Sequence, residues 1–264
     1  MHRNMHGKVG LLAVDLDGTL LRSDDSITAS NRRAIHKATS NGVQIVIATG
    51  RPYDEATHLL KPIHCPLPML DAGGADIRDT TGRSLRTILL GVEQAVAVLT
   101  TLLQYDLTRT TIYTSDGALI LEGPELQQRA CNIIPAILAA RIKILKILVS
   151  PIERKMLQRE LTARLSQIEG INVTSSAPWN IEILHQAANK GASLKWLASK
   201  YGVRFDQQAA VGDSCNDIDM FAAVGTSFAV ANAPTNVKRK ATVALTKTCD
   251  EDGVAQAIEV ILQM

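Results

Sequence analysis

Short apolar runs alternate with helix-like segments towards both ends of the chain. The runs are rich in β-branched residues or alanine and end at polar residues, over positions 11–14, 43–48 and 209–212. Such runs are typical of buried strands. Segments with helix start and stop signals follow them, over residues 30–41, 53–60 and 191–200. This alternation of strand and helix predicts a parallel sheet with right-handed crossovers.

The middle of the chain follows a different pattern. Residues 111–121 contain two β-rich runs around Asp116-Gly117, a dipeptide that favours a tight hairpin turn. A helix is expected to start at Pro151, and its apolar positions at helical spacing include Met156. The mixture of hairpins and helices predicts an α+β domain inserted between the two parts of the parallel sheet.

We therefore expect an α/β fold with two domains. Residues 1–83 and 186–264 are predicted to form a Rossmann-like parallel sheet core with helices on both faces. Residues 84–185 are predicted to form the inserted α+β domain. A chain of 264 residues is long enough to bury a core in each.

Composition narrows the class of protein. Lys and Arg number 28 against 26 Asp and Glu, so no strongly basic surface points to nucleic acid. The four cysteines are scattered without a CxxC pair, at positions 65, 131, 215 and 249. This favours reduced thiols in a cytoplasmic protein over disulfides or a zinc site. Charges interrupt the apolar stretch 133–149 and the apolar run near the start, so neither a membrane span nor a signal peptide is expected.

Polar residues follow the predicted core strands or precede core helices. They form four groups: Asp15 with Asp17, Thr49 with Gly50, Lys190, and Asp213 with Asn216 and Asp217. Asp15 and Asp17 are two residues apart in extended chain, so they point to the same side. Since ligands of parallel sheets bind at the carboxyl ends of the strands, we expect the four groups to share one edge.

These residue types suit a phosphorylated ligand. Carboxylate oxygens suit Mg²⁺, while a threonine hydroxyl and a glycine N–H can donate to an oxyanion. A lysine at a helix start attracts phosphate. Each group alone also has an ordinary structural explanation, because Asp-Gly forms turns, Asp caps helices and a lone lysine is usually solvated. Together they predict a site for a phosphoryl group held between a metal ion and Lys190.

The motifs resemble those of the haloacid dehalogenase-like (HAD) hydrolase superfamily, in particular Cof-type phosphatases with an α/β cap inserted after the second motif. The matching segments occur in the family's order: Asp15-Leu16-Asp17-Gly18-Thr19, Thr49-Gly50-Arg51, Lys190-Gly191 and Gly212-Asp213-Ser214-Cys215-Asn216-Asp217. The resemblance covers essentially the whole chain. It implies a phosphoric monoester hydrolase that acts on a small phosphorylated metabolite, such as a sugar phosphate or a cofactor-precursor phosphate, with residues 84–185 as the substrate-selecting cap.

The resemblance also implies a role for each site residue. Asp15 would be the nucleophile that forms an aspartyl-phosphate, and Asp17 would act first as general acid and then as general base. The residues that would bind the phosphate are Thr49, Gly50, Lys190 and Asn216. Mg²⁺ would be held by Asp15, the backbone carbonyl of Asp17 and Asp213, with Asp217 behind them.

One segment departs from the family pattern. Many of these phosphatases have Asn-Gly-Ala after the third strand, whereas this chain has Asp71-Ala72-Gly73-Gly74-Ala75. Gly73 has no amide side chain, so contacts near the phosphate site or the cap hinge are expected to differ.

Two alternative functions stay open. A phosphomutase on the same core would return the phosphoryl group to a sugar, and a non-catalytic protein would only bind a phosphorylated ligand. The presence of both Asp15 and Asp17 disfavours the second. No nucleic-acid or membrane partner is expected, and the oligomeric state and the substrate are left open.

Overall fold

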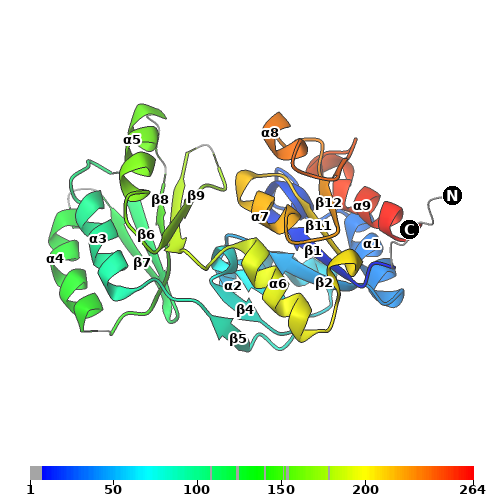
Figure 1. Ribbon diagram of the computed structural model, residues 1–264, viewed down its shortest axis with the longest axis horizontal. Coiled ribbons are helices and arrows are strands. Elements are labelled where there is room, and N and C mark those ends of the chain that lie inside the picture. The colour runs from blue at the N-terminus through cyan, green and yellow to red at the C-terminus, as the bar shows by residue number, and fades with distance from the viewer. Residues whose placement is uncertain are drawn as a thin grey trace. The chain divides into compact units, whose positions relative to one another are not determined.

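The computed structural model describes residues 8–107, 109–122, 125–139, 141–150, 152, 155–177 and 179–264, with the backbone alone over 125–131. The chain forms two compact units (Figure 1). The core unit comprises Met1–Arg86 and Lys190–Met264, and the inserted unit comprises Thr87–Asn189.

Eight strands form the sheet of the core unit in the described residues. They are β1 (Leu11–Asp15), β2 (Gln44–Ala48), β3 (Met69–Asp71), β4 (Asp76–Arg78), β5 (Ser84–Thr87), β11 (Gln208–Gly212), β12 (Thr226–Ala229) and β13 (Val243–Ala244). Their order across the sheet is β13-β12-β11-β1-β2-β3-β4-β5. The strands from β13 to β3 run parallel, and β4 is antiparallel to β3. The carboxyl ends of β1, β2 and β11 therefore meet at one edge.

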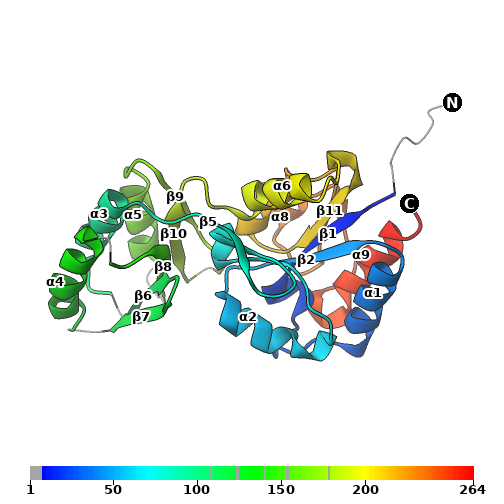
Figure 2. The same cartoon turned by 90° about the horizontal axis from the view of Figure 1, so that it is seen from below.

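Helices cover both faces of the core sheet. One face carries α1 (Ala29–Ser40), α2 (Tyr53–Leu60) and α9 (Gly253–Ile261), and the other carries α6 (Lys190–Lys200), α7 (Ile218–Phe221) and α8 (Thr235–Lys238) (Figure 2). Alternate residues of β1 point to opposite faces, so Leu12 packs with Ile258 in one buried cluster. Leu11 packs with Leu194 in the other. The expected α/β fold with a Rossmann-like sheet is confirmed.

The start and the end of α1 follow local sequence signals. Thr28 caps α1, and its Oγ1 accepts a hydrogen bond of 3.0 Å from the N–H of Asn31. The chain leaves α1 through Gly42, whose φ of 84° suits a residue without a side chain. These signals fix where α1 begins and ends between β1 and β2.

The inserted unit is an antiparallel sheet with helices on one face. Its strands are β6 (Arg109–Thr114), β7 (Gly117–Glu122), β8 (Ile144–Val149), β9 (Ile171–Thr174) and β10 (Ile181–His185), in the order β7-β6-β8-β10-β9. Its helices are α3 (Val92–Leu102), α4 (Glu125–Leu138) and α5 (Lys155–Leu165). Val98, Ile137 and Leu161 of these helices pack with Ile147 and Ile183 of the sheet.

Two features of the inserted unit differ from the sequence-based expectation. Met156 is 74% exposed, because the buried positions of α5, Leu161 and Leu165, are five and nine residues further on and lie on another face of the helix. The expected start of this helix at Pro151 lies outside the described residues. Helix α4 was not predicted, and it contains Pro135, a residue that disfavours helix interiors.

No helix in the described part of the chain is both long and apolar enough to cross a membrane.

Candidate active site

Asp15 and the turn after it form the centre of the site. Asp15 is the last residue of β1 and is 4% exposed. Gly18 has a φ of 73°, and a Cβ there would lie 2.6 Å from Oδ2 of Asp213. Only glycine allows this turn to approach the Asp213 loop so closely. Thr19 completes the contact, since its Oγ1 donates to Oδ1 of Asp213 over 3.2 Å.

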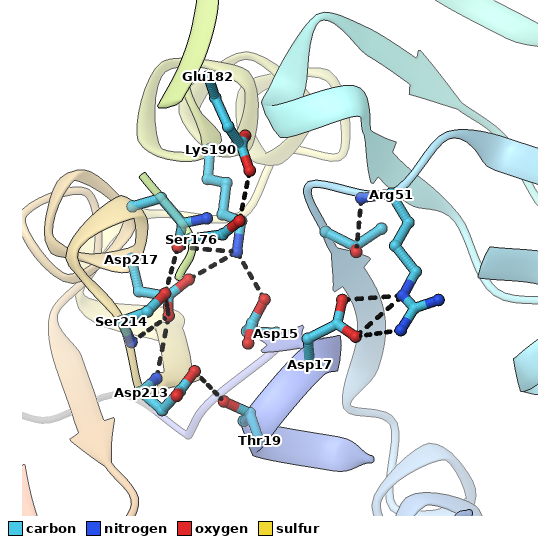
Figure 3. Close-up of polar contacts among 12 residues, drawn as sticks. Asp15, Asp17, Thr19, Arg51, Ser176, Glu182, Lys190, Asp213, Ser214 and Asp217 are labelled. Atoms are coloured by element: carbon cyan, nitrogen blue, oxygen red, sulfur yellow. Dashed lines mark hydrogen bonds and ion pairs between the residues drawn. The ribbon is translucent and has the colours of Figure 1, made fainter. Parts of the chain in front are cut away.

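Lys190 reaches the same point from the start of α6. Its side chain is 1% exposed, and its Nζ lies 2.6 Å from Oδ1 of Asp15 and 2.7 Å from Oδ1 of Asp217 (Figure 3). A longer contact of 3.4 Å joins Nζ to Oδ1 of Asn216. Burial alone would lower the pKa of Lys190, but the two carboxylates outweigh burial and raise it. The lysine is therefore a buried ammonium shared between two aspartates.

Asp217 organises the loop that follows β11. Its Oδ2 accepts hydrogen bonds from the backbone N–H of Asp213, at 2.9 Å, and of Ser214, at 3.0 Å. Its Oδ1 accepts from Lys190. Both carboxylate oxygens of Asp217 are thus engaged by donors, which fits a residue that holds the loop in place behind the site.

Three carboxylates crowd together at this edge of the sheet. One oxygen each of Asp15, Asp213 and Asp217 lies within 4.8 Å of the others. Burial, and then the charge of Asp217, hold the pKa of Asp15 well above its usual range despite the attraction of Lys190. The same two causes raise the pKa of Asp213 to about 6. The cluster carries more negative charge than Lys190 compensates.

This donor set fits a hard divalent cation. Carboxylates are acceptor-only ligands of the kind that such ions prefer, and the excess negative charge is what a cation would offset. Because the oxygens of Asp217 already accept hydrogen bonds, Asp15 and Asp213 are the two carboxylates best placed to bind an ion directly.

Thr49 and Gly50 lie at the end of the neighbouring strand β2. Thr49 is fully buried, and its Oγ1 accepts a hydrogen bond of 3.1 Å from the N–H of Arg51. That bond uses an oxygen lone pair, so the hydroxyl proton can still be donated. Because β2 pairs with β1, these two predicted residues follow the strand next to the one that ends at Asp15.

The side chain of Asp17 has a partner that the sequence reading missed. Asp17 is turned to Arg51 and not to Lys190 (Figure 3). Arg51 Nε lies 2.9 Å and 3.0 Å from the two carboxylate oxygens, and Nη2 lies 2.6 Å from Oδ1. Arg51 stands in the Thr-Gly-Arg motif, and arginine's preference for forked pairing with carboxylates was the available signal.

The segment that departs from the family pattern braces the site through its backbone. The N–H of Ala72 donates to the carbonyl of Arg51, and that of Gly73 donates to the carbonyl of Thr49, both over 2.9 Å. The carbonyl of Gly74 accepts a 2.6 Å hydrogen bond from Oγ of Ser193 on α6. This turn therefore links the loop after β2 to the helix that carries Lys190.

The chain matches proteins whose class agrees with this fold and site. Residues 12–258 match the family model of haloacid dehalogenase-like hydrolases. The phosphatase YwpJ of Bacillus subtilis is 29% identical, over 96% of this chain and 99% of its own. The 5-amino-6-(5-phospho-D-ribitylamino)uracil phosphatase YwtE of the same organism is 30% identical, over 95% of this chain and 97% of its own. A solved haloacid dehalogenase-like hydrolase from B. subtilis superposes with a TM-score of 0.83 at 26% identity, covering 95% of this chain and 99% of that one.

The α/β core, the inserted antiparallel unit and the buried lysine beside the cluster of three aspartates agree with the class of these proteins. The chain belongs to the haloacid dehalogenase-like hydrolase family. Within that family it is a phosphatase of the Cof type, as the motifs predicted.

Proposed function

We propose that the chain is a Mg²⁺-dependent phosphatase that hydrolyses a small phosphorylated metabolite through an aspartyl-phosphate. The observation that carries the proposal is the position of Lys190 Nζ, 2.6 Å from Asp15 and 2.7 Å from Asp217. A buried ammonium beside a strand-end carboxylate lowers the repulsion that a phosphate dianion would otherwise meet.

In the first step a carboxylate oxygen of Asp15 attacks phosphorus. A bond forms between Asp15 and phosphorus while the bond from phosphorus to the leaving oxygen breaks. Asp17, protonated at this stage, gives its proton to the leaving oxygen and becomes a carboxylate.

In the second step water replaces Asp15. The Asp17 carboxylate takes a proton from water as the water oxygen attacks phosphorus, and the bond from phosphorus to Asp15 breaks. Inorganic phosphate leaves and Asp15 is a carboxylate again. Throughout, Lys190 supplies positive charge to the phosphoryl oxygens, and Thr49, Gly50 and Asn216 supply hydrogen bonds.

The carboxylate ligands of the metal follow from the donor set, and the backbone carbonyl of Asp17 is added because the resemblance to the family implies it. Asp15, Asp213 and the backbone carbonyl of Asp17 would hold Mg²⁺, with Asp217 fixing the loop behind them. When bound, the ion supplies positive charge that stabilises the phosphoryl group in the transition state.

The substrate class is a small phosphate monoester, either a sugar phosphate or a cofactor-precursor phosphate. Support for the second comes from the relative whose name gives 5-amino-6-(5-phospho-D-ribitylamino)uracil as its substrate. The inserted unit would act as the cap that selects the leaving group, a usual role of such insertions.

The test is phosphate release from 4-nitrophenyl phosphate in Mg²⁺ and in EDTA, with the Asp15→Asn variant as control. The proposal expects release that requires both Mg²⁺ and Asp15. A panel of sugar phosphates and 5-amino-6-(5-phospho-D-ribitylamino)uracil then ranks substrates by kcat/KM.

Two outcomes would overturn the proposal. An isomeric sugar phosphate formed without free phosphate would identify a phosphomutase. Binding of phosphorylated metabolites without turnover of any phosphate ester would identify a binding protein.

A further inference from the structure

Asp17 has a single side-chain partner among the described residues. Its half-exposed carboxylate is contacted by Arg51, through Nε at 2.9 Å and 3.0 Å and through Nη2 at 2.6 Å. The planar guanidinium meets the carboxylate side-on, so it fixes the rotation of the carboxylate as well as its position.

The other aspartates of the site are held differently. Asp15 is buried against Lys190, and Asp217 receives Lys190 and two backbone N–H groups. Asp17 lies in a turn with 45% of its side chain exposed. A carboxylate with that exposure samples several rotamers unless a neighbour restricts it, and Arg51 is the neighbour that does so.

Arg51 is itself on a well-braced loop. Its N–H donates to Oγ1 of Thr49 over 3.1 Å, and its carbonyl accepts from the N–H of Ala72 over 2.9 Å. Its Nη2 also contacts Asp25 at 3.3 Å. The guanidinium is therefore carried by a backbone that is tied to Thr49 of its own loop and to Ala72 of the turn after β3.

We propose that Arg51 is a positioning residue that holds the Asp17 carboxyl where it can exchange a proton with the leaving oxygen and then with water. This inference rests on the proposed function. Arg51 forms no bond to the reacting atoms in this scheme and acts through Asp17. Replacing Arg51 should therefore lower activity most on substrates whose leaving oxygen must receive a proton, since a poor leaving group departs only if it is protonated.

A second arginine of the core unit supplies a matched control. Arg204 makes a similar forked pair with Asp206, at 3.0 Å and 2.9 Å. Its side chain is 66% exposed, and it precedes the start of β11, at the opposite end of that strand from Asp213. Exposed pairs of this kind contribute little to stability, so Arg204→Met should leave turnover unchanged.

The experiment compares leaving groups of one shape and different basicity. The variants are Arg51→Met, Arg51→Lys, Asp17→Asn, the double variant of Arg51→Met with Asp17→Asn, and Arg204→Met. The probes are 4-nitrophenyl phosphate and phenyl phosphate. The leaving group of the first, 4-nitrophenolate, departs without a proton, whereas phenolate is a more basic leaving group and needs one. Thermal melting of each variant checks folding, and kcat/KM reports the steps up to departure of the leaving group.

Arg51→Met is expected to lower kcat/KM for phenyl phosphate by about 100-fold, the lower end of general-acid effects. Its kcat/KM for 4-nitrophenyl phosphate should change by less than about fivefold, with a burst of nitrophenolate because the second step is slowed. Arg51→Lys keeps the charge without the fork, so it should recover only part of the loss. The double variant should match Asp17→Asn alone, because both changes remove one function.

Three results would overturn the inference. Equal losses for both probes through a raised KM would make Arg51 a phosphate-binding residue. Additive losses in the double variant would show that Arg51 acts independently of Asp17. Full activity of Arg51→Met on phenyl phosphate would show that the pair of Arg51 and Asp17 has only a structural role. Failure of the wild type to release nitrophenol would instead contradict the proposed function, so the two failures are distinguishable.

Discussion

Lys190 and Asp15 form a buried ion pair, with Nζ 2.6 Å from Oδ1, between residues 175 positions apart in the chain. The pair does not balance the charge of its surroundings, because Asp213 and Asp217 lie in the same cluster. The folded core therefore keeps like charges close together at its functional edge, a cost that active sites often carry.

Asp15→Asn should make the metal-free protein more stable while abolishing turnover. One buried negative charge is removed, and burial and Asp217 already disfavour the ionised form of Asp15. We expect the free energy of unfolding in EDTA to rise by about 1–2 kcal/mol, and kcat to fall by more than about 1,000-fold. Urea unfolding and phosphate release measure the two effects. Asp116→Asn, in the exposed turn before β7, is the control and should change neither.

The same variant tests metal binding without using activity. A ligand that binds only the folded state raises the melting temperature, so Mg²⁺ should stabilise the wild type more than Asp15→Asn. An equal rise in melting temperature on adding Mg²⁺ to both proteins would show that the ion binds away from Asp15.

Lys190→Met should destabilise the core strongly. Removing one partner of a buried ion pair leaves an uncompensated charge and costs about 3–5 kcal/mol, and here both Asp15 and Asp217 lose their cation. Lys195→Met is the matched control, since Lys195 is exposed on the same helix. Thermal melting in EDTA should separate the two variants clearly. A melting temperature for Lys190→Met as high as that of Lys195→Met would contradict this account of the site.

Much of the site could be predicted because its residues follow strand and helix boundaries that the sequence marks. Asp15 ends an apolar run, and Lys190 starts a helix, so topology alone brings them to one edge. Strand periodicity groups Asp17 with Asp15, whereas in the structure the side chain of Asp17 pairs with Arg51. That pairing depends on the path of two loops, and no local pattern encodes it. Helix α4 also depends on contacts between distant segments. Pro135 disfavours a helix locally, and packing within the inserted unit stabilises it.

Asp71 should make stability depend on pH near neutrality. It is the buried last residue of β3, directly before the turn that braces Thr49 and Arg51, and it shares Arg78 with Asp76. Burial, and then the charge of Asp76, raise its pKa from 3.8 to about 7. A carboxyl whose pKa is raised on folding contributes stability that is present at low pH and is lost as pH rises through the folded value.

The wild type should therefore lose stability between about pH 4 and pH 7, by at most about 4 kcal/mol from this group. Asp71→Asn should flatten that slope and be the more stable protein at pH 8. The midpoint of urea unfolding across this range measures the effect. Asp79→Asn is the control, because hydrogen bonding to Thr81 lowers the pKa of Asp79 and removes it from this window. Parallel pH profiles for wild type and Asp71→Asn would refute the assignment.

Gly191→Ala tests how closely α6 must approach α7. Alanine normally stabilises a helix relative to glycine, by about 0.5–1 kcal/mol. At this position an added Cβ would lie 2.1 Å from the carbonyl oxygen and 2.5 Å from the carbonyl carbon of Asp219. Because both are backbone atoms, α6 has to shift, and Lys190 at its first position shifts with it. We expect a loss of about 1–3 kcal/mol in stability, as for overpacked cores, together with lower kcat on 4-nitrophenyl phosphate. Ala192→Gly, at the next and exposed position, removes helix propensity without touching the contact and should leave kcat unchanged. A gain in stability from Gly191→Ala would show that the two helices have room to separate and that the position of Lys190 does not depend on their close contact.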